Sequence, residues 1–141
     1  MSFCSTRRPL AALALMALGT LMAPLAAHAA YPEKPIRLVV PYPPGGSSDI
    51  IARSISQPLS EALRQPVIVE NKPGANGNLG ADAVAKAAPD GYTLLTGSVS
   101  NMVLNMGLYK NLSYDSLRDF EPVGLAVSYS YTLIARADLP F

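Results

Sequence analysis

Three short apolar segments alternate with two helix-like segments after residue 35, and this alternation limits the chain to one class of fold. Residues 36–40, 66–70 and 92–96 are runs of the length and composition of buried strands. Between them, residues 47–64 carry apolar side chains every three or four positions, and residues 78–88 are rich in alanine. The order strand, helix, strand, helix, strand predicts an α/β fold with a mostly parallel sheet and flanking helices.

The ends of these segments carry local signals, and further elements follow them. Ser47 or Ser48 is expected to cap the first helix, with Asp49 in its first turn. After a polar loop, a short helix is predicted to end at Leu108, and its residues Met102 and Met106 are expected to face the core. Two more strands are predicted, over residues 123–127 and 131–136.

The first 29 residues have the three-part pattern of a secretory signal peptide. Arg7 and Arg8 precede an apolar run over residues 10–25, and Ala27-His28-Ala29 has the small residues of a cleavage site. The apolar run is shorter than the ~20 residues that a membrane-spanning helix needs. We therefore expect export by the ordinary secretory route, cleavage before Ala30, and a periplasmic mature protein.

Composition excludes several classes of function. The net charge is only +1, so no excess of cationic side chains is present to bind nucleic acid. The chain has one His and one Cys, and both His28 and Cys4 would be lost with the signal peptide. Catalysis by Ser-His-Asp or Cys-His systems and zinc sites built on these residues are therefore excluded. No phosphate-binding motif with its lysine occurs, so we expect no enzyme, no cofactor and no metal.

The loops that follow the three strands are the candidate binding site. Ligands of open α/β sheets bind beyond the carboxyl ends of the strands, and residues 41–48, 71–77 and 97–101 occupy those positions. Their Gly, Ser and Asn residues indicate either a cradle of amides and hydroxyls for a small anion or ordinary helix caps and turns. Tyr42 fits a pocket wall or simple packing equally well, whereas Lys72 fits a solvated surface position.

Four segments of the sequence resemble one family of transport proteins. They are residues 31–49, which include Pro41-Tyr42-Pro43-Pro44-Gly45-Gly46-Ser47-Ser48-Asp49, and residues 65–77, 88–95 and 119–123. Together they resemble the Bug, or TctC-type, extracytoplasmic solute receptors of tripartite tricarboxylate transporters. The resemblance implies a non-enzymatic, two-lobed periplasmic-binding-protein fold of type II, a small carboxylate as ligand, and the membrane subunits of such a transporter as partners.

The same resemblance implies ligand contacts from all three loops. Carried over by motif, the ligand-binding residues are Tyr42, Gly46, Ser47, Ser48 and Asp49 of the first loop, Asn76 and Gly77 of the second, and Ser98, Ser100 and Asn101 of the third.

Receptors of this family are about twice as long as this chain, so the resemblance also implies a truncated product. Residues 1–29 are then the signal peptide, residues 30–127 part of the first lobe, and residues 128–141 the start of the crossover to the second lobe. Because only one wall of the cleft is encoded, we expect weak binding and a tendency to self-associate. A non-binding interaction or regulatory remnant is the alternative function, and a secreted enzyme is a further one.

Overall fold

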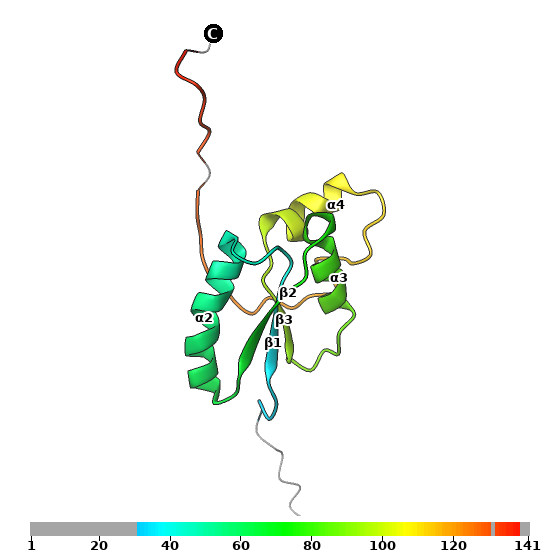
Figure 1. Cartoon of the computed structure of the whole chain (residues 1–141). Coiled ribbons are helices and arrows are strands. Elements are labelled where there is room, and N and C mark those ends of the chain that lie inside the picture. The colour runs from blue at the N-terminus through cyan, green and yellow to red at the C-terminus, as the bar shows by residue number, and fades with distance from the viewer. Residues whose placement is uncertain (1–30, 131, 139–141) are drawn as a thin grey trace, which may run out of the picture. The chain divides into compact units, whose positions relative to one another are not determined.

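The computed structural model describes residues 31–130 and 132–138, and these residues form a small α/β unit (Figure 1). Along the chain, its elements are β1 (Ile36–Val40), α2 (Ser47–Leu63), β2 (Val67–Asn71), α3 (Asn78–Ala85), β3 (Thr93–Leu95), a π-helical turn (Ser100–Leu104) and α4 (Asn105–Leu108). The predicted α/β class and the predicted order of the first five elements are confirmed.

The three strands form one parallel sheet in the order β2-β1-β3. β1 lies in the centre, with Leu38 opposite Val69 on one side and Leu94 on the other. The strands are parallel because each connection crosses the sheet through a helix rather than a hairpin. Their carboxyl ends therefore lie at one edge, which brings the loops after β1 and β3 close together.

The core lies between the central strand and α2, with α3 on the other face of the sheet (Figure 1). Leu38 and Val40 are buried against Ala52, and Ile55 packs at the margin of this cluster. On the other side, the close approach of α3 depends on Gly80, where a Cβ atom would lie 2.7 Å from the Cβ atom of Pro41. Helix α2 thus reaches this core cluster through Ala52 and Ile55.

Several predicted boundaries shift by one to three residues. The second strand is Val67–Asn71, one residue later than predicted, and α3 ends at Ala85 instead of residue 88. The Ala87 N–H bonds the Val84 carbonyl, which tightens the last turn of α3 ahead of Pro89. Tyr92 and Thr96 lie outside β3, although the Arg37 N–H still bonds the Tyr92 carbonyl.

The prediction of two strands near the carboxyl end is wrong for the residues that the structure describes. Residues 121–130 and 132–136 form neither helix nor strand, residues 137 and 138 form a turn, and residue 131 lies outside the described residues. Val123 and Leu125 are 85% and 86% exposed, and Leu133 is 98% exposed. An apolar, β-rich run becomes a strand only when another strand bonds its backbone, and these described residues pair with none.

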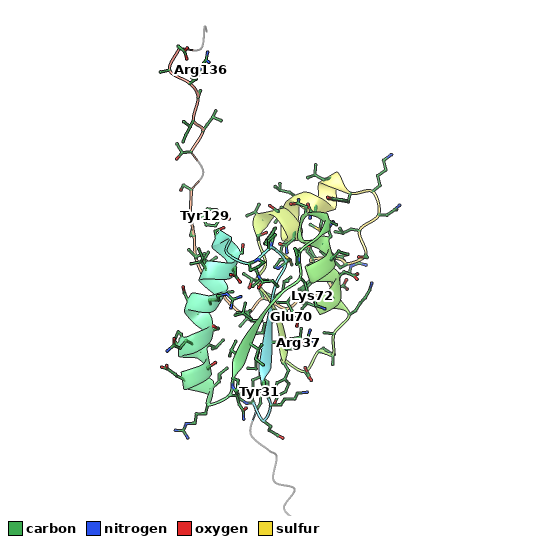
Figure 2. The ribbon with its side chains drawn as sticks, viewed as in Figure 1. Tyr31, Arg37, Glu70, Lys72, Tyr129 and Arg136 are labelled. Atoms are coloured by element: carbon green, nitrogen blue, oxygen red, sulfur yellow. The ribbon has the colours of Figure 1, made fainter. Side chains whose placement is uncertain are left out.

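Charged side chains on the first two strands form an ion cluster on the sheet surface (Figure 2). Arg37 donates to Glu70 Oε2 at 2.6 Å from Nη2 and 3.0 Å from Nε, and Lys72 Nζ lies 3.5 Å from Glu70 Oε1. Arg37 and Lys72 lower the pKa of the Glu70 carboxyl below its usual value, with the Arg37 hydrogen bond as the main cause. Lys72 is 39% exposed, as the surface interpretation predicts.

The predicted signal peptide lies outside the described residues. Among the helices that the structure does describe, none has the length and apolar character needed to cross a membrane. The described part begins at Tyr31, whose hydroxyl donates to the Gly91 carbonyl at 2.7 Å. The chain is therefore held to the amino-terminal side of β3 from the first described residue onward.

Candidate solute site

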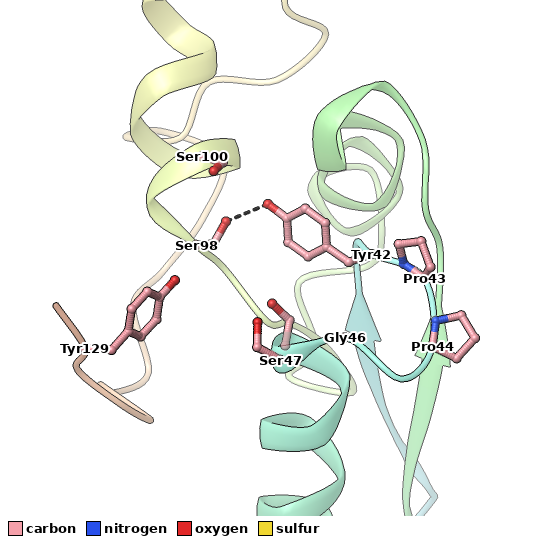
Figure 3. Close-up of a pocket in the computed structure, with 9 residues that line it drawn as sticks. Tyr42, Pro43, Pro44, Gly46, Ser47, Ser98, Ser100 and Tyr129 are labelled. Carbon is pink, nitrogen blue, oxygen red and sulfur yellow. Dashed lines mark hydrogen bonds between the residues drawn. The ribbon is translucent and has the colours of Figure 1, made fainter. Parts of the chain in front are cut away.

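A hollow of about 360 Å³ lies beyond the carboxyl ends of β1 and β3 (Figure 3). We call it the serine hollow, because four of its lining residues are serines. It is lined by Tyr42, Pro43, Pro44, Gly46, Ser47, Ser48, Ser98, Ser100 and Tyr129. The loop after β1, the start of α2 and the loop after β3 thus converge on one site, as expected for an open α/β sheet.

The amino-terminal end of α2 forms one side of the serine hollow. Gly46 is the N-cap, and its carbonyl accepts the first helical bond, from the Ile50 N–H at 3.0 Å. No side chain caps the helix, so the prediction that Ser47 or Ser48 is the cap is wrong. Both serines lie in the first turn instead, where backbone N–H groups lack helical acceptors and the helix dipole is positive.

Asp49 stabilises this turn from the buried side. One carboxylate oxygen accepts from the Gly45 N–H at 2.9 Å and from Arg53 Nε at 3.0 Å, and the other accepts from the Asn71 side chain at 3.0 Å. These three donors, with Arg53 first, hold the pKa of the Asp49 carboxyl far below its usual range. Because Arg53 balances its charge, the carboxylate orders the loop without adding an uncompensated negative charge beside the serine hollow.

A chain of hydroxyl groups joins the loop after β1 to the loop after β3. The Tyr42 hydroxyl lies 2.7 Å from Ser98 Oγ, and Ser98 Oγ donates to Asn101 Oδ1 at 2.9 Å. The Ser98 N–H donates to the same Asn101 oxygen at 2.7 Å. Since the Ser98 hydroxyl proton is directed at Asn101, Tyr42 is the donor to Ser98. Tyr42 also packs against the core cluster. It therefore both lines the serine hollow and contributes to packing.

The second loop supports Tyr42 rather than lining the hollow. A 3₁₀ turn, Ala75–Gly77, ends at Gly77, whose φ is +88°. A Cβ atom there would lie 3.2 Å from Asn101 Cβ and 3.3 Å from the Tyr42 hydroxyl. Glycine is therefore required at this position both by the backbone conformation and by the close approach of Tyr42. Asn76 points to Asn105, with its Nδ2 atom 2.9 Å from Asn105 Oδ1.

The structure brings six of the ten predicted site residues to the serine hollow. They are Tyr42, Gly46, Ser47, Ser48, Ser98 and Ser100. Asp49, Asn76, Gly77 and Asn101 lie next to these residues but do not line the hollow. Asn101 is fully buried, and its Nδ2 atom has no hydrogen-bond partner among the described residues.

Sequence reasoning missed three lining residues, Pro43, Pro44 and Tyr129. Tyr129 lies across the serine hollow from Tyr42 (Figure 3), in a segment that the sequence assigned to a crossover. No local signal marks that residue, since its place depends on contacts with residues far away in the chain. The expectation for the methionines was partly wrong, because Met102 is half-buried whereas Met106 is 41% exposed.

The chemistry of the lining is uncharged. No Arg, Lys, Asp or Glu side chain is among the residues that line the serine hollow in the described part of the chain. Residues 31–130 and 132–138 also contain no group of three or more His, Cys, Asp or Glu side chains arranged to hold a metal ion. The polar groups available are hydroxyls and the amides of the first turn of α2, which suit an anion or another acceptor-rich solute.

Comparison with known proteins identifies the family. Residues 51–141 match the tripartite tricarboxylate transporter family receptor, TctC. The chain belongs to this TctC family. The resemblance found in the sequence is therefore confirmed, and the chain belongs with the binding proteins of transporters, which are not enzymes.

TctC-family relatives are much longer than this chain. A UPF0065 protein of Bordetella pertussis is 45% identical over 123 residues, which are 85% of this chain and 37% of that protein. Protein BugT of the same organism is 42% identical over 110 residues, 77% of this chain and 34% of BugT. The chain thus spans about a third of the length of the curated relatives that it matches.

Solved structures of similar proteins share the fold of the described unit. MatC from Rhodopseudomonas palustris, with bound malate, has a TM-score of 0.64 at 40% identity, covering 66% of this chain and 32% of MatC. The periplasmic binding protein BugD has a TM-score of 0.61 at 42% identity, covering 67% of this chain and 31% of BugD. A second R. palustris protein, solved with adipate, has a TM-score of 0.60 at 36% identity, covering 62% of this chain and 29% of that protein.

Proposed function

We propose that this chain is part of a periplasmic receptor that binds a small carboxylate in the serine hollow and delivers it to a tripartite tricarboxylate-type transporter. The observation that carries the proposal is the convergence of the first turn of α2 with Ser98 and Ser100 on one uncharged hollow. Two relatives solved with malate and adipate support the choice of a carboxylate.

A carboxylate fits the groups that face the serine hollow. Unpaired N–H groups and the positive end of the α2 dipole favour a negative charge, and the hydroxyls of Ser47 and Ser48 add donors beside them. Ser98 has its own proton engaged with Asn101 and accepts from Tyr42, so it contacts the solute by packing and not by donating a hydrogen bond to the carboxylate. We propose Tyr42, Gly46, Ser47, Ser48, Ser98 and Ser100 as contact residues, and Asp49, Asn76, Gly77 and Asn101 as their supports.

Recognition by neutral donors suits a receptor that must release its solute. A bidentate arginine bond to a carboxylate is strong and geometrically demanding, whereas each bond from an uncharged hydroxyl or amide is a single contact that contributes less. In a two-lobed receptor the contacts of both lobes add up. Since this chain spans about a third of its relatives, we expect the 141-residue chain alone to bind with a Kd of ~1 mM or weaker.

Export to the periplasm belongs to the same proposal. We assign residues 1–29 to a signal peptide, residues 30–127 to part of the first lobe, and residues 128–141 to the start of a crossover. BugD and another solved relative are described as periplasmic proteins, which supports this location.

Nuclear magnetic resonance titration tests the proposal, because it detects millimolar binding. Malate and adipate are added to the uniformly ¹⁵N-labelled chain, and the diamide of succinic acid serves as a control of similar size without charge. We expect saturable shifts of the Gly46, Ser47 and Ser48 amides with the two dicarboxylates and none with the diamide. Equal shifts with the diamide, or no shifts at these amides, would contradict a carboxylate site in the serine hollow.

A further inference from the structure

A cluster of amide side chains, three of which are buried, lies behind the serine hollow. The asparagine cluster consists of Asn76, Asn78, Asn101, Asn105 and Tyr114, and it joins the start of α3, the π-helical turn and the loop after α4. Asn101 and Asn105 are fully buried, and Asn78 is 8% exposed. Burying an amide costs free energy unless its groups are hydrogen-bonded. The three segments must therefore keep the arrangement in which these side chains bond one another.

Asn105 is hydrogen-bonded to both Asn76 and Asn78. Its Nδ2 atom donates to Asn78 Oδ1 at 2.5 Å and to the Asn76 carbonyl at 3.1 Å, while its Oδ1 atom accepts from Asn76. These bonds determine the orientation of the Asn78 amide, since its oxygen must face the Asn105 donor. Asn78 therefore presents the same oxygen to Tyr114.

Tyr114 closes the asparagine cluster from the loop after α4. It is 5% exposed, its ring meets Phe120 edge-on at a centroid distance of 5.7 Å, and its hydroxyl lies 3.0 Å from Asn78 Oδ1 and 2.5 Å from the Asn101 carbonyl oxygen. Burial raises the pKa of the Tyr114 hydroxyl above its usual value, so the group remains a neutral donor at physiological pH. Its one proton faces two acceptors, of which the Asn101 carbonyl is nearer.

The residue that accepts from Tyr114 also holds the lining of the serine hollow. Asn101 receives the Tyr114 hydroxyl at its backbone carbonyl, and its side-chain oxygen receives both the N–H and the hydroxyl of Ser98. Ser98 in turn accepts from Tyr42. A continuous series of hydrogen bonds thus runs from Tyr114, through Asn101, to the side chains on both sides of the hollow.

We propose that Tyr114 is a positioning residue of the solute site: its hydroxyl holds Asn101, and through Asn101 it holds Ser98 and Tyr42 in place on the serine hollow. Tyr114 does not touch the hollow itself. The relevance of this positioning to solute binding rests on the proposed function, whereas the positioning itself is measurable without any ligand. Asn101 belongs to a π-helical turn, a distortion that is common at functional sites.

Amide hydrogen exchange of Ser98 is the direct test. The Ser98 N–H donates to Asn101 Oδ1 at 2.7 Å, so its exchange rate reports how well Asn101 is held. In Tyr114→Phe, which keeps the ring and removes the hydroxyl, we expect Ser98 to exchange about 2- to 10-fold faster, the factor that corresponds to the net contribution of one hydrogen bond. The Ile36 N–H, bonded to the Pro66 carbonyl, should keep its rate and report on the sheet.

Two variants control for a merely structural effect. Tyr31→Phe removes a hydroxyl that also donates to a backbone carbonyl, that of Gly91 at 2.7 Å, and it should leave the Ser98 rate unchanged. Phe120→Leu keeps the Tyr114 hydroxyl but removes its edge-on ring contact, and it should also leave Ser98 unchanged. Equal acceleration of Ser98 in either control, or equal acceleration of Ile36 in Tyr114→Phe, would overturn the proposal.

A measurement on the unsubstituted chain covers the case in which Tyr114→Phe does not fold. The hydroxyl proton of Tyr114 should be visible by nuclear magnetic resonance as a slowly exchanging signal, because it is buried between two acceptors. A hydroxyl proton that exchanges with water as fast as that of an exposed tyrosine would overturn the proposal.

Malate titration separates this inference from the proposed function. If malate shifts the amides of the first turn of α2, Tyr114→Phe should weaken its binding about 2- to 10-fold, and Tyr31→Phe should not change it; unchanged binding in Tyr114→Phe would overturn the role in the solute site. If malate shifts no amide even in the unsubstituted chain, the proposed function fails, while the Ser98 exchange rate still decides whether Tyr114 positions the hollow.

Discussion

The hydroxyl of Tyr42 lies 2.7 Å from Oγ of Ser98, although the two residues are 56 positions apart in the sequence. Tyr42 follows β1 and Ser98 follows β3, and the parallel pairing of these two strands brings both residues to the same edge of the sheet. This contact joins the two loops that form the serine hollow. Several testable consequences depend on the geometry around it.

Removing the Ser48 hydroxyl should weaken carboxylate binding. Ser48 lines the serine hollow in the first turn of α2, so Ser48→Ala should cost ~0.5–1.5 kcal/mol of binding free energy, the net contribution of one hydrogen bond. Lys72→Ala is the matched control, because Lys72 is 39% exposed, pairs with Glu70 and does not line the hollow. Titration with malate measures both, and loss of binding in Lys72→Ala with normal binding in Ser48→Ala would show that the site is misplaced.

A methyl group at Gly80 should destabilise the fold. A Cβ atom there would lie 2.7 Å from Pro41 Cβ and 2.9 Å from the Lys72 carbonyl oxygen, so Gly80→Ala must separate α3 from the end of β1. We expect a loss of ~1–3 kcal/mol in the free energy of unfolding, as for overpacked cores. Gly107→Ala, with no atom within 4 Å of the added group, should be neutral or slightly stabilising, because alanine is the better helix former. Urea unfolding measures both changes, and equal stabilities of the two variants would contradict the observed packing of α3.

The stability contributed by Asp49 should depend on pH in a definite direction. Arg53, the Gly45 amide and Asn71 lower the pKa of this carboxyl in the folded state. A lowered folded-state pKa means that the contribution is present above the unfolded-state pKa of ~4 and is lost as the pH falls through the folded-state value. Asp49→Asn should therefore lower stability at neutral pH, and its difference from the parent chain should narrow below pH ~4.

The control for Asp49 is the same change at Asp138. That side chain is 71% exposed and pairs with Arg136 at 2.6 Å near the carboxyl end, so Asp138→Asn should leave stability unchanged at every pH, as is usual for exposed ion pairs. Chemical unfolding at a series of pH values measures both variants. A constant difference between Asp49→Asn and the parent chain across the acid range would refute the assigned role of the carboxylate.

Expression with the natural amino terminus should give a processed, exported protein. The basic residues Arg7 and Arg8, the apolar run after them and Ala27-His28-Ala29 predict cleavage before Ala30. Mass spectrometry of a periplasmic extract should find an amino terminus at Ala30 or within a residue or two of it. A full-length product retained in the membrane fraction would show that the segment is an anchor.

The sequence by itself determined that three strands follow one another along the chain and run parallel, but not their order in the sheet. Ile36–Val40 is apolar and bounded by prolines, and the periodic segment 47–63 after it can only return the chain to the same edge of the sheet. Strand length, helical period and turn residues are local properties, so they can be recognised without knowledge of the neighbours. The same reasoning placed Tyr42, Ser48 and Ser98 near one another, because the carboxyl ends of parallel strands share an edge.

Only the tertiary structure shows which strands pair and which side chains act through contacts with residues far away in the sequence. Residues 123–127 have the composition of a strand but pair with no other strand among the described residues, since pairing depends on a neighbour and not on composition. Asp49 has the sequence signature of a helix start, yet only the contacts with Gly45, Arg53 and Asn71 show that it orders the loop. Tyr114 carries no local signal at all, because its function depends on hydrogen bonds to Asn78 and Asn101, 36 and 13 residues away.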